Sequence, residues 1–132
     1  MRFPASRRIR SQGDFQRLRQ APHKLNCGPF FVQAAPASPD QPYSRLGVIA
    51  SRKVGNAVRR NRARRWFREL FRTHPEALPV PCDLVIIVRP AFIREPFAEL
   101  EARYLKACLR LTAFLQKDRP PATPPPSSSD PS

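Results

Sequence analysis

Several features that would indicate a membrane, secreted or zinc-binding protein are missing from this sequence. Its 3 cysteines are odd in number and lack CxxC spacing, which fits neither a disulfide framework nor a zinc site. We expect Cys27, Cys82 and Cys108 to be small buried side chains. No apolar run approaches the roughly 18–20 residues that cross a bilayer. The basic N-terminal segment lacks the apolar stretch of a signal peptide, so we expect a cytoplasmic protein.

A constellation for acid–base or metal chemistry is also missing. His23 and His74 lie far apart in the sequence, and each stands beside a proline. A protein that cut RNA with its own side chains would usually need positioned acid and base groups. The carboxylates show no metal-ligand spacing, and Asp83 is expected to end a turn. The sequence therefore predicts no catalytic residue, no metal ligand and no small-molecule substrate for the protein itself. The carboxylates considered are Asp14, Asp83, Glu95, Glu99 and Glu101.

Negative charge is scarce, and this indicates the class of partner. The chain has 24 Lys and Arg residues against 10 Asp and Glu, a formal net charge of +14. Such a charge attracts polyanions, so nucleic acid is the first candidate partner and an anionic membrane surface a weaker second. Hydrophobic residues make up 41% of the 132 residues, which is enough for one packed domain.

The chain divides into one domain and a tail. Residues 1–118 carry the apolar residues of the core, whereas residues 119–132 are rich in proline and serine and are expected to be disordered. Alternating or continuous apolar residues predict strands, and apolar residues three and four apart predict helices. The result is a mixed α+β domain with one small sheet. The predicted strands are 30–34, 45–50 and 83–89, and the predicted helices begin near Ser11, Asn56 and Pro96.

The last predicted helix has an apolar stripe of the kind that faces a core. Pro96 is a plausible first helical residue, because its missing N–H is not needed there. The stripe follows alternating steps of three and four residues. Its members are Phe97, Leu100, Tyr104, Cys108, Leu111 and Leu115.

The helix predicted over 56–73 has an apolar arc and a basic remainder. On a wheel of about 100° per residue, the apolar side chains share one arc. Like charges four residues apart destabilise a helix, so a solvated face without a partner would normally mix signs. Arginine also makes bidentate contacts with phosphate and stacks on bases. The arc contains Ala63, Trp66, Phe67, Leu70 and Phe71. A continuous row on the other side contains Asn61, Arg65, Arg68 and Arg72.

The segment before this helix suits a phosphate. Asn56 is a good N-cap, and Gly55 permits an unusual φ or a close approach of the backbone. Helix N-termini attract anions, and Arg52 and Lys53 add two cations beside this one.

These residues together resemble a known family. Residues 45–62 read RLGVIASRKVGNAVRRNR, and the central run from Gly55 to Arg62 is followed by a basic and aromatic helix and then by a strand that begins with Asp83. In this order they resemble the signature of the bacterial ribonuclease P protein component. The resemblance extends over about residues 9–108.

The resemblance implies both an activity and a fold. The family matures precursor tRNA by removing the 5′ leader, while a large RNA performs the phosphodiester hydrolysis with bound Mg²⁺. The resemblance implies a 1:1 complex of protein and catalytic RNA, in the cytoplasm, with endoribonuclease activity belonging to the complex. The implied fold has αβββαβα order, a four-stranded sheet like the second domain of ribosomal protein S five, and a left-handed βαβ crossover.

The resemblance also implies two groups of binding residues. The leader is expected in a cleft between the 56–73 helix and the open sheet face. Arg19 and Gln33 stand where the family often has aromatic residues, so leader binding here is expected to depend more on charge. The RNA-subunit group is Arg59, Arg60, Asn61, Arg62, Arg64, Arg65, Arg68 and Arg72, and the leader group is Phe15, Arg19, Phe31, Gln33, Arg52, Lys53 and Asn56.

Two other interpretations share some of these features. A structural protein that binds ribosomal RNA would have a similar charge, size and fold type. A DNA-binding helix module would share the basic helix, but the sequence has no dimerisation element and no helix-turn-helix spacing.

Overall fold

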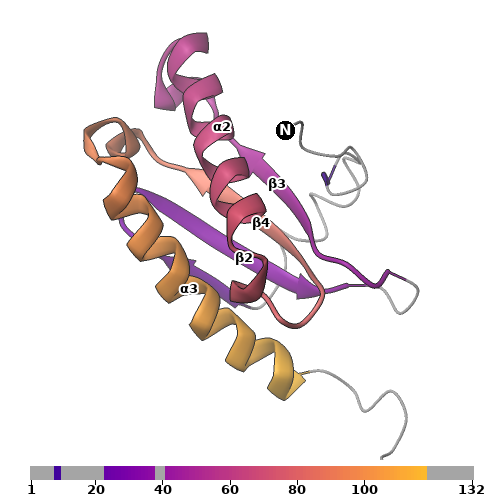
Figure 1. The fold of residues 1–132 in the computed structure, drawn as a ribbon. Coiled ribbons are helices and arrows are strands. Elements are labelled where there is room, and N and C mark those ends of the chain that lie inside the picture. Colours follow the sequence, from indigo (N-terminus) through magenta and orange to yellow (C-terminus); the bar gives the residue numbers. More distant parts are fainter. Residues whose placement is uncertain (1–7, 10–22, 38–40, 119–132) are drawn as a thin grey trace, which may run out of the picture.

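The computed structural model describes residues 8–9, 23–37 and 41–118 (Figure 1). The helix expected near Ser11 and the tail over 119–132 lie outside the described residues, so the proposed domain limits stay a prediction. No described helix is both long and apolar enough to cross a membrane. The elements are β1 His23–Asn26, β2 Phe30–Pro36, β3 Arg45–Ile49, η2 Arg52–Val54, α2 Ala57–Thr73, η3 Pro75–Ala77, β4 Cys82–Val88, η4 Pro90–Arg94 and α3 Phe97–Asp118.

The four strands form one mixed sheet in the order β1-β2-β4-β3. β1 and β2 are antiparallel, as are β2 and β4, whereas β3 and β4 are parallel and are joined through α2. In Figure 1, α2 lies in front of the sheet, both strands point toward the top, and the chain passes from β3 on the right to β4 on the left. This connection is left-handed, against the general rule for parallel strands. The implied α+β fold is confirmed for the described residues.

Three of the strands match the strands predicted from apolar patterns, and the fourth was implied only by the family resemblance. β1 reads HKLN and contains a single large apolar side chain, Leu25. A strand at the edge of a sheet buries little, so its pattern is weak. β1 becomes recognisable only through its antiparallel register with β2, in which Leu25 lies opposite Val32.

Both helices pack on the same face of the sheet and enclose the main core. α2 lies over β3, and α3 lies over β1 and β2. The ring of Phe67 in α2 contacts that of Phe30 in β2 at 4.9 Å in an edge-to-face arrangement. The predicted α3 stripe is buried from Leu100 to Leu115. α3 begins at Phe97 and not at Pro96, because the Pro96 carbonyl accepts the first helical hydrogen bonds, from Glu99 N and Leu100 N.

The opposite face of the sheet carries the alternate residues of each strand. Since side chains alternate along a strand, Phe31 and Gln33 point away from Phe30 and Val32, which are in the core. Val85 of β4 is fully buried on this second face and packs with Ile9. The short segment at Ile9 also joins the outer edge of β3, because Ile9 N donates to the Leu46 carbonyl at 2.9 Å.

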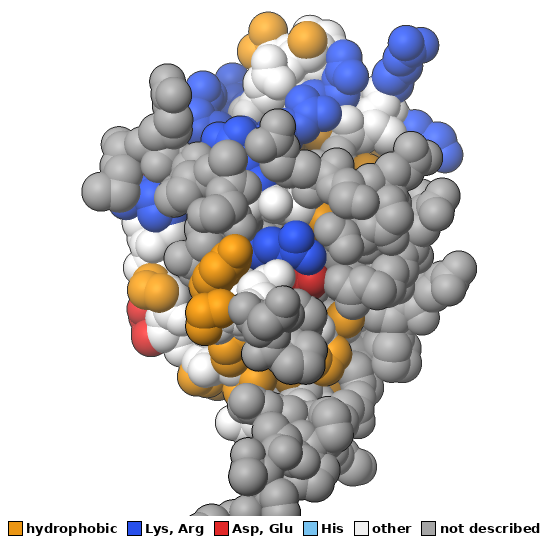
Figure 2. Space-filling view, turned by 90° about the vertical axis from the view of Figure 1, so that its right-hand side faces the viewer, with side chains coloured by type: hydrophobic (Ala, Val, Ile, Leu, Met, Phe, Trp, Pro, Cys, Tyr) orange, Lys and Arg blue, Asp and Glu red, His pale blue; other side chains and the backbone are white. Residues whose placement is uncertain are grey.

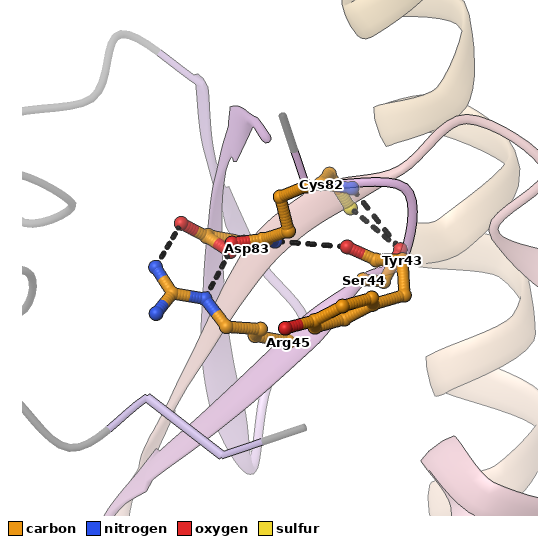
Figure 3. Close-up of polar contacts among 6 residues, drawn as sticks. Tyr43, Ser44, Arg45, Cys82 and Asp83 are labelled. Atoms are coloured by element: carbon orange, nitrogen blue, oxygen red, sulfur yellow. Dashed lines mark hydrogen bonds and ion pairs between the residues drawn. The ribbon is translucent and has the colours of Figure 1, made fainter. Parts of the chain in front are cut away.

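Asp83 corrects one prediction. It does not end a turn but lies inside β4, opposite Arg45 of β3, and is 1% exposed. Arg45 Nε donates to Asp83 Oδ1 at 2.9 Å and Arg45 Nη2 to Oδ2 at 2.8 Å, a bidentate pair visible in Figure 3. A buried carboxylate needs such a partner because desolvation opposes its charge. This pair fixes the register of the two parallel strands.

The cysteines pack largely as expected. Cys82 and Cys108 are buried in the core, whereas Cys27 is half-buried, and all three are free thiols. Burial raises the pKa of both Cys82 and Cys108 to about 12. The Ser44 hydroxyl accepts a hydrogen bond from Cys82 N at 3.0 Å and so supports the start of β4 (Figure 3).

His74 joins the end of α2 to α3. Its Nε2 lies 2.7 Å from Glu101 Oε2 and its Nδ1 lies 3.3 Å from Glu76 Oε2. The hydrogen bond with Glu101 raises the pKa of His74 above 6.5, although burial opposes the shift. His74 is therefore a structural contact, and its side chain is only 21% exposed.

We expect Asp83→Asn to lower the free energy of unfolding by about 3 kcal/mol, because it removes one partner of a buried ion pair. Urea denaturation followed by circular dichroism measures the change. The matched control is Arg45→Met with Asp83→Leu, which removes both charges and should recover most of the loss. A loss under about 0.5 kcal/mol for Asp83→Asn would show that the pair contributes nothing.

The stability contributed by His74 should decrease with pH. Because the folded pKa is raised, the contribution is complete below the unfolded pKa of 6.5 and is lost as pH rises through the folded pKa. Wild type should therefore exceed His74→Gln in denaturation midpoint at about pH 5.5, and the difference should shrink by about pH 8.5. A difference that does not change with pH would contradict this assignment. Glu101→Gln should remove most of the dependence.

Candidate nucleic-acid interface

The N-terminus of α2 is built by two residues that the sequence analysis identified. Asn56 is the N-cap, and its Oδ1 accepts a hydrogen bond from Arg59 N at 3.0 Å. Gly55 has a φ of +144°, and a Cβ there would lie 2.6 Å from Arg59 Cδ. Glycine is favoured here because residues with a side chain rarely adopt this positive φ. Both predictions are confirmed.

The turn before α2 presents two cations. In η2, the Ser51 hydroxyl accepts a hydrogen bond from Lys53 N at 3.3 Å, and Val54 anchors the turn with 3% exposure. The side chains of Arg52 and Lys53 are left exposed beside the N-terminus of α2. Free N–H groups and two cations at one point make this end of the helix suitable for a phosphate.

The rest of α2 separates apolar from basic side chains as the wheel predicted. Phe67 and Leu70 are fully buried, and the half-buried Trp66 packs edge-to-face on Phe92 at 5.5 Å and on Phe97 at 5.3 Å. We call the basic side the α2 ridge. It consists of Arg59, Arg60, Asn61, Arg62, Arg64, Arg65, Arg68 and Arg72, of which Arg60, Arg64 and Arg68 are half-buried and the others exposed.

Members of the α2 ridge differ in how far their polar groups are already engaged. Arg72 forms an ion pair with Glu69, with Nη2 2.6 Å from Oε2. Arg64 Nη1 donates to Asn61 Oδ1 at 3.1 Å, which holds both side chains on the surface. Arg60 Nε is buried and has no hydrogen-bond partner within the described part of the chain. Among the described residues, the cations of the α2 ridge that form no ion pair therefore lie in the turns before Arg72.

A further cation, Arg8, lies near Arg68 of the α2 ridge. It was not identified as a binding residue from the sequence. Arg8 forms a parallel bridge with Leu46, which places it at the outer edge of β3. Burial first, and then the charges of Arg8 and Arg64, lower the pKa of the Arg68 guanidinium. Arginine stays protonated in proteins, so Arg68 keeps its charge in a partly buried position beside two other cations. On the side shown in Figure 2, Lys and Arg side chains gather over the upper part, where α2 and η2 lie.

A second basic group surrounds Phe31 on the outer face of the sheet. Lys24 Nζ lies 4.7 Å from the centre of the Phe31 ring and Arg89 Cζ lies 4.9 Å from it. Lys24 comes from β1 and Arg89 follows β4, the two neighbours of β2 in the sheet. Neither Lys24 nor Arg89 was identified as a binding residue from the sequence, because only the strand order brings them together. Together they form an aromatic and cationic surface of the kind that binds single-stranded RNA.

The leader cleft expected between α2 and the open sheet face stays a prediction. On the core face, Phe67 of α2 packs directly on Phe30 of β2 and closes the helix against the sheet. Phe31 and Gln33 point to the other face, where Gln33 is only 3% exposed and offers little surface to a ligand. Phe15 and Arg19 lie outside the described residues.

Five carboxylates in the described ranges form ion pairs with cations. Within these ranges, no group of three or more His, Cys, Asp or Glu side chains is placed to hold a metal ion. The engaged carboxylates are Glu69 with Arg72, Glu76 and Glu101 with His74, Asp83 with Arg45, and Glu99 with Arg103.

Comparison with known proteins agrees with the resemblance. The sequence profile of the family described as Ribonuclease P matches residues 3–112. The ribonuclease P protein component of Syntrophobacter fumaroxidans is 34% identical over 90 residues, which are 67% of this chain and 74% of that protein. That of Chloroflexus aggregans is 36% identical over 110 residues, 80% of each chain.

Solved structures share the fold. The ribonuclease P protein of Staphylococcus aureus is 28% identical with a TM-score of 0.71, covering 83% of this chain and 97% of that one. The protein from Thermotoga maritima is 33% identical with a TM-score of 0.69, covering 78% of this chain and 96% of the other. The chain therefore belongs to the ribonuclease P protein component family and is the protein subunit of a ribonucleoprotein endoribonuclease that processes the 5′ end of tRNA.

Proposed function

We propose that the α2 ridge docks the RNA subunit of ribonuclease P and that a separate surface holds the 5′ leader of precursor tRNA. The leader surface includes η2, the helix N-cap Asn56 and the outer sheet face at Phe31. Within the leader group implied by the resemblance, the exposed cations Arg52 and Lys53 would contact phosphates, and the ring of Phe31 would contact a base.

The observation that supports RNA-subunit docking is the crowding of cations on and beside α2. Like charges at i, i+4 along this helix oppose its stability, yet only Glu69 supplies a negative charge within it. Burial first, and then the charges of Arg8 and Arg64, lower the pKa of Arg68, so part of the shift comes from neighbouring cations. A polyanion would relieve the repulsion among like charges on this helix, and guanidinium groups form bidentate hydrogen bonds with the phosphates of a folded RNA.

The leader surface is supported by its position at one end of the sheet. Phe31 lies opposite Ile87 of β4, and Ile87 lies opposite Ile49, the last residue of β3. η2 follows β3 after only two residues, so its cations stand at the same end of the sheet as the Phe31 ring. A single strand crossing this end would meet phosphate-binding groups and a stacking surface in succession.

The chemistry is assigned to the RNA subunit, as the family resemblance implies. Mg²⁺ in the holoenzyme would activate or position water at the scissile phosphate, and the RNA would be its main ligand. Five carboxylates of the protein already form ion pairs with Arg or His side chains. This supports the assignment of Mg²⁺ binding to the RNA subunit. One protein would bind one RNA subunit in the cytoplasm.

We expect Arg65→Ala and Arg68→Ala each to weaken binding of the RNA subunit. Each lost phosphate contact should reduce the slope of log K against log salt by about 0.9. Filter binding of the catalytic RNA across a salt series measures the slope. Arg65→Lys and Arg68→Lys are matched controls, because they keep the charge and should keep the slope. If both alanine variants keep the wild-type slope, the α2 ridge does not contact the phosphates of the RNA subunit.

Phe31→Ala should weaken binding of precursor tRNA relative to mature tRNA by about 1–3 kcal/mol, the value of one stacked base. Binding of both RNAs to the reconstituted holoenzyme measures the difference. Phe31→Tyr should retain the preference, whereas Phe31→Leu, which keeps an apolar side chain but has no aromatic face, should lose it. If the leucine variant behaves as wild type, the ring does not stack with the leader.

A further inference from the structure

A basic groove lies at the edge of the sheet that is farthest from α2. It has a volume of about 570 Å³ and runs between α3 and the hairpin that joins β1 to β2. Leu25 and Ala107 contribute apolar surface, and three cations of α3, Arg103, Lys106 and Arg110, line it. α3 covers β1 and β2 while α2 covers β3, so the groove and the α2 ridge lie on different sides of the molecule.

The three cations form one row. Spacings of three and four residues place Arg103, Lys106 and Arg110 on the same side of α3. Arg103 is held by Glu99, with Nε 2.9 Å from Oε2. Lys106 and Arg110 are exposed and form no ion pair with any residue that the structure describes. Burial raises the pKa of the half-buried Cys27 thiol, and the nearby charges of Arg103 and Arg110 oppose this rise.

The groove is connected to the Phe31 surface through the β1–β2 hairpin. Arg89, whose guanidinium stands over the Phe31 ring, donates from Nη1 to the Gly28 carbonyl at 3.1 Å. Arg103 donates from Nη1 to the neighbouring Cys27 carbonyl at 2.8 Å. Arg89, which follows β4, and Arg103 of α3 therefore hold adjacent carbonyls of the same turn. Cations thus continue from the outer face of the sheet into the groove.

Gly28 is the residue that permits this close packing. Its φ is +91°, and a Cβ would lie 2.9 Å from Arg103 Nη1. Any other residue would both strain the turn and displace the arginine. The hairpin thus brings the two arginines together without placing a side chain between them.

We propose that the groove between α3 and the β1–β2 hairpin binds phosphates of the precursor-tRNA leader, at nucleotides 5′ to those held at Phe31. The inference rests on the proposed function, which places the leader on the Phe31 surface. The cleavage site must stay close to the RNA subunit, which is bound at the α2 ridge. Leader nucleotides at the opposite edge of the sheet are therefore those farthest from the cleavage site along the RNA. Rows of cations that follow a backbone are typical of proteins that bind single strands without reading their sequence.

The test compares precursor tRNAs with leaders of roughly 5 and roughly 15 nucleotides, a range that spans known single-strand site sizes. Wild-type holoenzyme should bind the long-leader precursor more tightly. Lys106→Ala with Arg110→Ala should reduce affinity for that precursor on the order of fivefold and leave the short one unchanged. The salt slope for the long leader should fall by about 1.4 if two single-strand phosphate contacts are lost.

A charge-preserving exchange is the matched control. Lys106→Arg with Arg110→Lys keeps both positive charges and should bind the long leader as wild type does. Wild-type affinity of the double alanine variant for the long leader would overturn the inference. Equal weakening for short-leader precursor, mature tRNA or the RNA subunit would also overturn it, because the groove would then contact RNA other than the distal leader.

The two proposals fail in different ways. If wild-type holoenzyme does not distinguish precursor from mature tRNA, the leader surface of the proposed function is wrong. If it does distinguish them, but a longer leader adds no affinity, the Phe31 surface stands and only the groove is excluded.

Discussion

The contact of Phe67 with Phe30 decides how every arginine of α2 is presented. The two rings meet at 4.9 Å in the fully buried core, and this holds one side of α2 against the sheet. Edge-to-face pairs add about 0.5–1.5 kcal/mol to the burial of their area. Because the apolar arc is held inside, the basic residues have no position available except the surface. The rigidity of the core therefore maintains an array of like charges that would not be stable on an isolated helix.

The sheet distributes the remaining binding groups between two faces and two edges. The face under the helices is sealed, so a ligand reaches the sheet only from the other side or around its edges. Phe31 stands on the open side with a cation from each neighbouring strand, and the β1–β2 hairpin connects it to α3. Under the proposed function, one side of the protein would stay attached to the RNA subunit while another guides the single-stranded leader.

The surfaces proposed to bind RNA are those where like charges lie close together and oppose folding. Where charge serves stability, it is paired and buried, as in Arg45 with Asp83, or it joins elements, as in His74 with Glu101. Where cations outnumber acids, on the α2 ridge and in the α3 groove, like charges lie close together and oppose the folded state. Such uncompensated charge is what a polyanion neutralises, with release of its own counterions.

The sequence by itself determined the local features: the N-cap at Asn56, the glycine at 55, the sides of α2, the stripe of α3 and three of the strands. These follow from periodicity and from hydrogen bonds within four residues, so they need no distant partner. Only the tertiary structure decided that Asp83 is buried beside Arg45, that Phe31 faces away from α2, and that Lys24, Arg89 and Arg103 gather around one hairpin. Those arrangements depend on strand order and register, including a left-handed crossover, which are set by the packing of the whole chain.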